Sequence, residues 1–247
     1  MRDDCGYDPH WWKAEKAASL ARKREQQSAS AWAKPGDAFL IVTEGTVAEP
    51  VYFELLRRDL ELSAIRIQVL PGEASDPRRV IEMASREAKA QELRAKRGQL
   101  RMDEPERFDQ VWAVIDTDVA VRQGHWNDVR QLAAARKVKL AHSSPCFEFW
   151  LLLHLRYNTH PLVDGAAAKS ALKHALGQDY AKNAATTQAA IELLIPKWPA
   201  AVANAERVSR HHQQAATPEP ANPSSEVWQL ATAMNDSTPE YQRKQRS

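Results

Sequence analysis

The chain has 247 residues, 43% of them hydrophobic and 27% charged, so it is long enough to bury one substantial core. Its 34 Lys and Arg residues nearly balance its 32 Asp and Glu residues, and the net charge of +2 excludes a polybasic, histone-like binder. Two cysteines are too few for a disulfide framework or a cysteine-built zinc site. We find no apolar run long enough to cross a membrane and no apolar signal core, and therefore expect a soluble cytoplasmic protein without a membrane partner.

The composition divides the chain into three parts. Residues 1–36 are polar, basic and rich in good helix formers, which predicts a helical extension that ends at Pro35-Gly36. Residues 37–215 carry the patterns of a folded domain. Residues 216–247 are rich in proline, and we expect them to form a mostly disordered tail. Within this tail, residues 225–234 could instead form a short docking helix.

Apolar runs alternate with helical periodicities along residues 37–215. Continuous or alternating apolar runs predict strands at 39–43, 65–70, 111–115 and 138–141. Helical spacing predicts helices at 51–60, 77–97, 123–136 and 147–155, and a helical C-terminal part over 166–212. This order predicts an α/β fold with a parallel sheet flanked by helices on both faces.

Acidic residues follow two of these strands directly. Glu44 comes after the first apolar run, and Asp116 and Asp118 come after the third. Because ligands of an open α/β sheet bind outside the carboxyl ends of its strands, we expect the three carboxylates to converge. Asp116 and Asp118 are two residues apart, which in extended backbone places both side chains on one side. Hard oxygen ligands of this kind suit Mg²⁺ or Mn²⁺, and metal-assisted phosphodiester cleavage is the chemistry that fits.

Two further acids are candidates for the same metal site. Glu49 precedes Pro50 at the start of a predicted helix, where it either helps to bind metal or only favours the positive helix end. Glu148 is surrounded by Phe, Trp and Leu, and a buried carboxylate needs a metal, a partner or a proton.

Structural roles compete with these assignments. Asp116 or Asp118 is equally suited to capping the helix that follows. We expect Cys146 to be a packed thiol and His154 to be a core histidine rather than a ligand. The chain contains no P-loop, dinucleotide-binding or Gly-x-Ser-x-Gly motif, which counts against NTPase, dehydrogenase and serine-hydrolase functions.

Several stretches resemble the RloB family, which includes AbiLii-type abortive-infection proteins. The most specific is Ser144–His154, with the sequence SPCFEFWLLLH. The others, in the same order as in the family, are Phe39–Gly45, Glu49–Phe53, Phe108–Asp118, Asp179–Asn183 and Asn222–Ser225. The resemblance extends from about Asp37 to Met234.

The resemblance implies a Toprim-like fold, as in the nuclease half of OLD-type proteins, and a role in phage defence beside an ATPase partner of the AAA or ABC type. The Toprim pattern places its characteristic Glu on Glu44 and its Asp-x-Asp on Asp116 and Asp118. In related nucleases a lysine near the metals helps to stabilise the transition state, and Lys182 is the candidate here.

The sequence departs from the family pattern beside the Asp pair. Val119 stands where the family often has another acid, and Thr117 replaces a frequent Arg. These changes would weaken the support for metal binding, so that the site would use one metal ion or none.

The leading interpretation is a Mg²⁺-dependent Toprim-type nuclease or phosphotransferase that acts on nucleic acid, with Glu44 as metal ligand or general base. The alternative is a non-catalytic Toprim-like subunit that regulates an ATPase or binds a nucleotide signal. DNA, RNA and nucleotide substrates all stay open, as does assembly into a homo-oligomer. Candidates for phosphate contacts, which a solvated helix face explains equally well, are Arg57, Arg58, Arg78 and Arg79.

Overall fold

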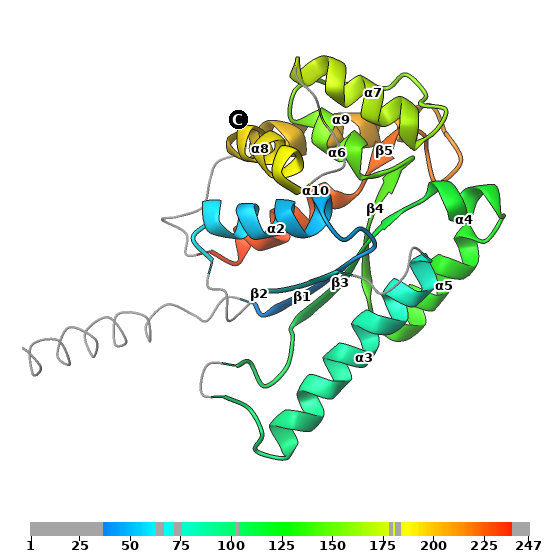
Figure 1. Ribbon diagram of the computed structural model, residues 1–247. Coiled ribbons are helices and arrows are strands. Elements are labelled where there is room, and N and C mark those ends of the chain that lie inside the picture. The colour runs from blue at the N-terminus through cyan, green and yellow to red at the C-terminus, as the bar shows by residue number, and fades with distance from the viewer. Residues whose placement is uncertain are drawn as a thin grey trace, which may run out of the picture. The chain divides into compact units, whose positions relative to one another are not determined.

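A five-stranded sheet in the order β2-β1-β3-β4-β5 forms the centre of the fold (Figure 1). The structure, a computed structural model, describes residues 37–62, 67–71, 76–101, 104–177, 180 and 184–238. The predicted extension 1–36 and the candidate lysine Lys182 lie outside these ranges. The strands are β1 (Phe39–Thr43), β2 (Ile67–Pro71), β3 (Gln110–Asp116), β4 (Lys139–Ser144) and β5 (Ser224–Ser225).

Helices connect and cover these strands. They are α2 (Ala48–Asp59), α3 (Pro77–Lys96), α4 (Asp118–Arg122), α5 (Trp126–Arg136), α6 (Phe147–Leu153), α7 (Gly165–Leu176), α8 (Ala184–Leu194), the 3-10 turn η1 (Ile195–Lys197), α9 (Trp198–Gln214) and α10 (Val227–Asp236). Within the described ranges, none of these helices is both long and apolar enough to span a membrane.

The strands from β1 to β4 run parallel, as the alternation of strand and helix predicted. The α/β fold with a mostly parallel sheet and a helical C-terminal part is therefore confirmed. The sequence did not predict β5, which pairs antiparallel with β4 through Ser143–Ser225 and Ser144–Ser224.

Two helical layers bury the two faces of the sheet. In β1 every residue is buried, because Phe39 and Ile41 pack into one core and Leu40 and Val42 into the other. Figure 1 shows α3 and α5 on one face, and α2, α6 and the C-terminal helices on the other. Burial on both faces is the reason that this strand is a continuous apolar run.

The larger core lies under α2, α6 and α9, around the fully buried rings of Tyr52, Trp150 and Trp198. His154 donates from Nδ1 to the Trp150 carbonyl oxygen (3.0 Å), so its Nε2 accepts from the Tyr52 hydroxyl (3.1 Å) in the neutral ring. Burial lowers the pKa of His154 to about 4. The prediction of a core histidine is confirmed.

Local signals place the helix ends. Asp76 caps α3 by accepting from the Arg78 N–H at 3.0 Å, with Pro77 at the first helical position. The helix predicted at 123–136 is α5, which begins at Trp126, and a short helix that was not predicted, α4, precedes it. Gly124 separates them with a φ of +71°, a conformation that glycine adopts without strain.

The prediction of a mostly disordered tail is wrong for residues 216–238. Ser224 and Ser225 are buried because they pair with the open edge of β4, and α10 buries Leu230 and Met234 in the larger core. The helix considered at 225–234 exists as α10 and packs against the chain's own core. Residues 239–247 lie outside the described ranges.

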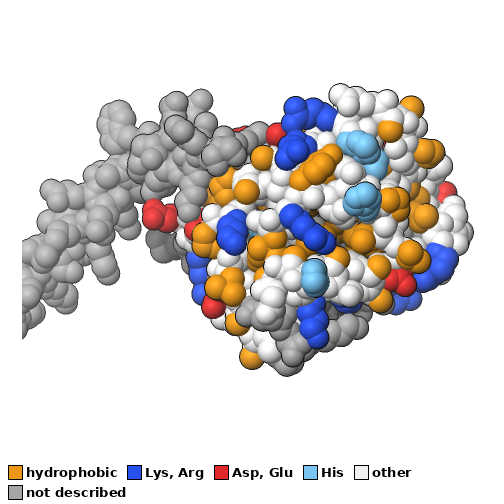
Figure 2. All heavy atoms as spheres, turned by 90° about the horizontal axis from the view of Figure 1, so that it is seen from above, with side chains coloured by type: hydrophobic (Ala, Val, Ile, Leu, Met, Phe, Trp, Pro, Cys, Tyr) orange, Lys and Arg blue, Asp and Glu red, His pale blue; other side chains and the backbone are white. Residues whose placement is uncertain are grey.

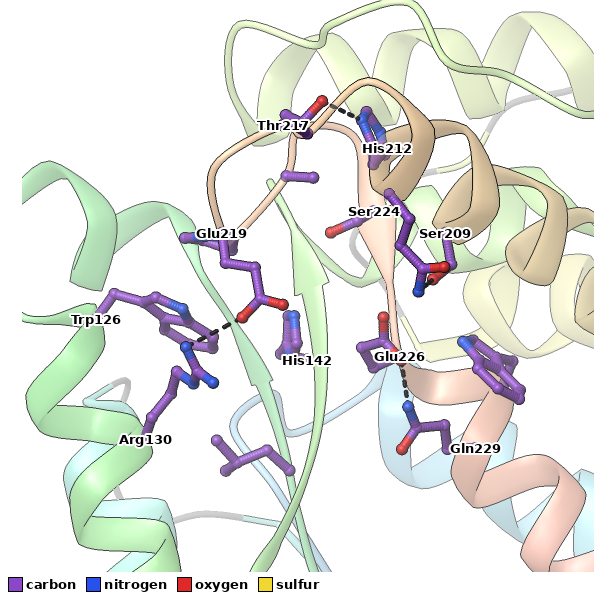
Figure 3. A pocket seen from close by; sticks show the side chains of 16 residues that line it. Trp126, Arg130, His142, Ser209, His212, Thr217, Glu219, Ser224, Glu226 and Gln229 are labelled. Carbon is purple, nitrogen blue, oxygen red and sulfur yellow. Dashed lines mark hydrogen bonds and ion pairs between the residues drawn. The ribbon is translucent and has the colours of Figure 1, made fainter.

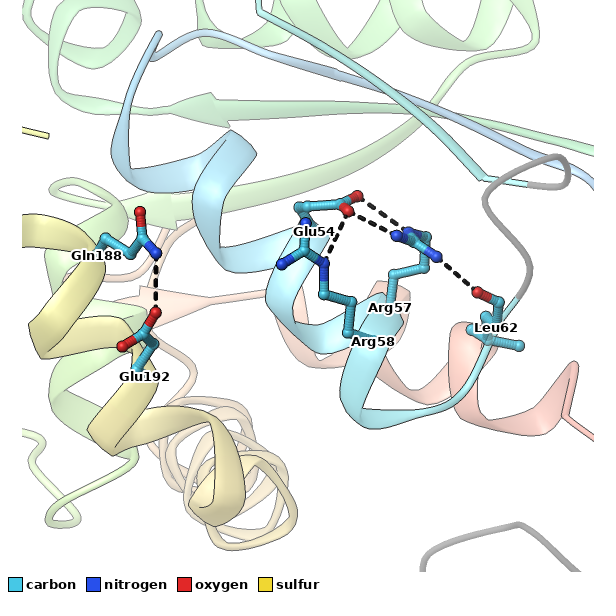
Figure 4. Close-up of polar contacts among 6 residues, drawn as sticks. All are labelled: Glu54, Arg57, Arg58, Leu62, Gln188 and Glu192. Carbon is cyan, nitrogen blue, oxygen red and sulfur yellow. Dashed lines mark hydrogen bonds and ion pairs between the residues drawn. The ribbon is translucent and has the colours of Figure 1, made fainter. Parts of the chain in front are cut away.

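The outer face of α2 shows that its arginines serve the local structure (Figure 4). Arg57 and Arg58 both pair with Glu54, at 2.5 and 3.1 Å, and Arg57 also donates to the Leu62 carbonyl oxygen at 2.8 Å. Arg58 is 64% exposed, as on a solvated helix face, whereas Arg57 is only 13% exposed and binds the segment that follows α2. Figure 4 also shows α8, where Gln188 donates to Glu192 at 2.8 Å.

Candidate functional site

The ends of the neighbouring strands β1 and β3 bring Glu44 and Asp116 together. The Glu44 N–H donates to the Val114 carbonyl oxygen at 2.8 Å, which continues the pairing of the two strands by one residue. The Asp116 N–H then donates to Glu44 Oε2 at 3.1 Å. The Glu44 carboxylate therefore lies across the end of β3, next to the Asp116 backbone.

Asp116 is held from the other side by the start of α6. Its Oδ1 accepts from the Phe147 N–H at 2.9 Å, where the helix dipole favours a negative charge. Burial nevertheless raises the pKa of Asp116 well above its ordinary value, and repulsion from Glu49, Glu44 and Glu148 raises it further. Desolvation and like charges thus outweigh the helix end.

Glu44 shows the same balance. Burial raises its pKa to about 7, the hydrogen bond from Asp116 opposes this rise, and repulsion from Glu49 and Asp118 adds to it. At neutral pH a substantial share of this carboxyl is protonated.

Glu49 comes from the first turn of α2 and is 7% exposed. Burial raises its pKa to about 7, hydrogen bonds from the N–H groups of Glu49 and Gly45 oppose the rise, and Glu148 adds to it. A Cβ atom on Gly45 would overlap the Glu49 carboxylate. Glycine is thus needed at position 45 so that this carboxylate can lie against the backbone.

Glu148 comes from the first turn of α6 and has a cationic neighbour. Lys169 Nζ on α7 lies 3.5 Å from Glu148 Oε1. Partial burial disfavours the charge of Lys169, but the Glu148 carboxylate favours it, and the net result is a raised pKa. Sequence reasoning did not identify Lys169, because nothing in the alanine-rich start of α7 shows that α7 packs beside α6.

These side chains line one cavity of about 500 Å³. We call it the acidic cavity. Its carboxylates come from the end of β1, the start of α2, the end of β3 and the start of α6. The residues that define it are Glu44, Glu49, Asp116, Glu148 and Lys169, with Gly45–Ala48, Phe147, Tyr180 and Thr187 completing the wall.

Comparison with known proteins identifies the family of this chain. Residues 39–234 match the model of a family described as RloB-like protein. The chain belongs to the RloB-like family. This confirms the resemblance, and the family is associated with restriction loci and defence. Searches of curated proteins and of solved structures find no match.

In this RloB-like chain the second acid of the Asp-x-Asp pair takes a different position from the expected one. Thr117 adopts helical backbone angles, so the extended geometry assumed for this pair is wrong. Asp118 begins α4, its Oδ1 accepts from the Val119 N–H at 2.7 Å, and it does not line the acidic cavity. It acts on the site through its charge, which raises the pKa values of Glu44 and Asp116.

The donors suit a divalent cation in their chemistry. Within the described ranges, no three His, Cys, Asp or Glu side chains are arranged to hold a metal ion as they stand. Glu44 and Asp116 each have one oxygen engaged by a backbone N–H and a second oxygen available. Carboxylate oxygens around a cavity are the hard ligands that Mg²⁺ and Mn²⁺ take, and a cation would relieve the repulsion that raises these pKa values.

Proposed function

We propose that this RloB-like protein is a metal-dependent nuclease of the Toprim type that hydrolyses phosphodiester bonds in phage defence. The observation that carries the proposal is the convergence of four carboxylates from separate elements on the acidic cavity. Buried like charges are costly, and a set of them around an open cavity is a common feature of functional sites.

Each residue of the cavity has a role in this proposal. Glu44 and Asp116 would be the principal ligands of Mg²⁺ or Mn²⁺, and Glu49 and Glu148 would complete the set. A divalent cation bound there supplies Lewis-acid stabilisation of phosphoryl oxygens and acidifies a water. The alternative role for Glu44, in place of metal ligand, is general base, because a carboxyl that titrates near neutral pH can accept a proton from the attacking water.

The Lys169 ammonium at the cavity wall is suited to pairing with a phosphate oxygen of the substrate. Lys182, which the family resemblance suggested for this role, stays a prediction because it lies outside the described ranges. Asp118, at the rim, is a supporting charge.

The surface around the C-terminal helices fits an anionic substrate. Figure 2 looks onto the helices at the top of Figure 1, and Lys, Arg and His side chains occupy the middle of this face, with Asp and Glu mostly at its margins. Basic residues also end α7 and α9, among them Lys173, His174 and His211. We infer a nucleic-acid substrate from this charge pattern, and an ATPase partner from the family's association with defence.

The test combines metal binding with cleavage. Titration of the full chain with Mn²⁺, followed by electron paramagnetic resonance, should show saturable binding that Asp116→Asn weakens by at least about tenfold. Cleavage of single- and double-stranded DNA and RNA should need Mg²⁺ or Mn²⁺ and should be lost in Asp116→Asn and Glu44→Gln. Glu192→Gln, on the exposed side of α8, is the control and should keep both properties.

A non-catalytic subunit is the second candidate, and the position of Asp118 favours it. One acid of the family pattern binds its own helix rather than the cavity. If Asp116→Asn folds and still protects cells from phage, the acidic cavity is not catalytic and the regulatory candidate replaces the nuclease.

A further inference from the structure

A second cavity, of about 460 Å³, lies between α5, β4, β5 and the start of α10 (Figure 3). It shares no lining residue with the acidic cavity. Trp126 reaches into it from α5 and His142 from β4, Glu226 and Gln229 line the opposite wall, and Arg130 on α5 lies at its mouth. We call it the aromatic cavity and define it by Trp126, His142, Ser224, Glu226 and Trp228.

Three polar groups in this wall lack a hydrogen-bond partner in the described part of the chain, namely the Nε1–H groups of Trp126 and Trp228 and the Ser224 hydroxyl. Trp126 is 6% exposed and Ser224 is 7% exposed. Across the described part of the chain, neither the Trp126 Nε1–H nor the Ser224 hydroxyl has a hydrogen-bond partner. A buried donor without an acceptor costs free energy, so the Trp126 N–H and the Ser224 hydroxyl are suited to donating hydrogen bonds to a bound molecule.

Flat rings form one side of the cavity. The Trp126 and His142 rings are 4.9 Å apart between centroids, in an edge-on arrangement. Burial and, to a smaller extent, the Arg130 charge lower the pKa of His142 to about 4, so this ring is neutral near neutral pH. Neutral aromatic walls favour a planar, uncharged ligand.

The opposite side offers an acceptor. Glu226 is half-buried, and one of its oxygens, Oε2, accepts from the Gln229 amide. Burial raises the pKa of Glu226. Its carboxyl group lines the cavity, where it can accept hydrogen bonds from the N–H groups of a ligand.

A cationic side chain stands at the mouth rather than inside. Arg130 pairs with Glu219 at 3.0 Å, and both side chains are more than half exposed, at 52% and 69%. With one carboxyl inside and this ion pair outside, the interior does not suit a phosphate group. A phosphate attached to a ligand would remain at the mouth, near Arg130.

His212 fixes the wall that carries Ser224. Its Nε2 donates to the Pro223 carbonyl oxygen at 2.8 Å, which leaves Nδ1 to accept from the Thr217 hydroxyl at 3.2 Å. His212 joins the end of α9 to the loop before β5. The cavity is thus held in shape by the fold before any ligand binds.

We propose that the aromatic cavity binds a nucleobase, as the base of a nucleoside or nucleotide. The ring edge of a nucleobase carries acceptors for the Trp126 N–H and the Ser224 hydroxyl, and N–H donors for Glu226. Its flat face packs against the neutral His142 ring, to which the Trp126 ring is edge-on. The volume lies within the range of small-molecule sites. This inference is independent of nuclease activity, because it concerns different residues.

The test measures binding of GMP, AMP, CMP and UMP to the full chain by calorimetry in EDTA, so that no metal contributes. We expect saturable binding of at least one nucleotide and none of ribose 5-phosphate, which lacks the base. Trp126→Phe keeps the ring without its N–H, and Glu226→Gln keeps the shape without the charge. Each should weaken binding by about tenfold, as expected for the loss of one buried hydrogen bond.

The matched control is Glu192→Gln, an exposed change on α8, which should bind as the unaltered chain does. Glu44→Gln should also leave binding unchanged. The proposal is overturned if no nucleotide binds saturably, if ribose 5-phosphate binds equally well, or if binding is lost in Glu44→Gln but kept in Trp126→Phe and Glu226→Gln. Thermal melting of every variant verifies that it is folded.

Discussion

The acidic and aromatic cavities contain buried titratable groups that burial shifts in opposite directions. In the acidic cavity burial raises the pKa values of Glu44 and Glu49 to about 7, and in the aromatic cavity it lowers that of His142 to about 4. In both places burial favours the neutral form. The cavities differ in their neighbours, because other carboxylates surround Glu44 and Asp116 in the first, whereas His142 of the second stands beside a tryptophan and Arg130.

This difference separates the ligands that the two sites suit. Repelling carboxylates gain from a cation, which removes the repulsion and restores their charge. Neutral rings with unpartnered hydrogen-bonding groups gain instead from an uncharged, flat ligand. The two cavities have similar volumes but different chemistry. The ends of β1 and β3 bring carboxylates together in the first, and the edge strands β4 and β5 bring aromatic and polar side chains together in the second.

The largest expected effect is the loss of metal-dependent cleavage in Asp116→Asn. Asparagine keeps an oxygen for the Phe147 N–H but lacks the negative charge, so we expect a fall of at least about a hundredfold in cleavage rate. The same variant in EDTA should melt at an equal or higher temperature, because it lacks the carboxyl that the neighbouring glutamates repel. A lower melting temperature with unchanged cleavage would show that Asp116 serves stability.

Gly45→Ala should damage the acidic cavity through its shape. The new Cβ would overlap the Glu49 carboxylate, so we expect a loss of about 1–3 kcal/mol in the free energy of unfolding, together with weaker Mn²⁺ binding. Gly165→Ala is the control, since its Cβ would lie at an ordinary 3.4 Å from Cys146 Sγ. Equal stability of the two variants would contradict the packing of Glu49 on Gly45.

Glu44 and Glu49 should give stability the opposite pH dependence from His142. Folding raises the pKa of Glu44 and Glu49, so their contribution is present below about pH 4.5 and is lost as the pH rises to about 7. Folding lowers the pKa of His142 from 6.5 to about 4, so its contribution is present above about pH 6.5 and is lost as the pH falls towards 4. Within its window each group changes the free energy of unfolding by at most about 1.4 kcal/mol per pH unit.

Denaturant unfolding in EDTA between pH 4.5 and 7.5 measures these slopes. Relative to the unaltered chain, the double variant Glu44→Gln/Glu49→Gln should gain stability more steeply with rising pH, and His142→Gln less steeply. Comparing variants cancels the contribution of His154, which all of them share. Parallel curves for all three proteins would show that the two cavities do not differ in this way.

The smallest effect is expected at the mouth of the aromatic cavity. Glu219→Gln breaks the exposed ion pair with Arg130 and should change the free energy of unfolding by less than about 1 kcal/mol. It should also free Arg130 and tighten the binding of GMP relative to guanosine. A larger loss of stability would mean that this pair holds the loop in place.

Local patterns in the sequence were sufficient to predict the parallel sheet and the meeting of two of the four carboxylates of the acidic cavity. The apolar runs that become β1 and β3 show strands buried on both faces, and parallel strands end at one edge, so Glu44 and Asp116 were expected to meet there. The family resemblance in the sequence pointed to the same two residues. These features depend on short-range periodicity, which is visible in any window of a few residues.

The sequence by itself thus determined the α/β order, the buried strands and the acids that follow them. Only the tertiary structure decided that Lys169 lies beside Glu148, that Asp118 turns into α4, and that the proline-containing segment 216–226 closes the edge of β4. The physical reason is distance along the chain: these features depend on the packing of segments far apart in sequence, or on the backbone angle of one residue such as Thr117. Hydrophobic periodicity carries no information about either.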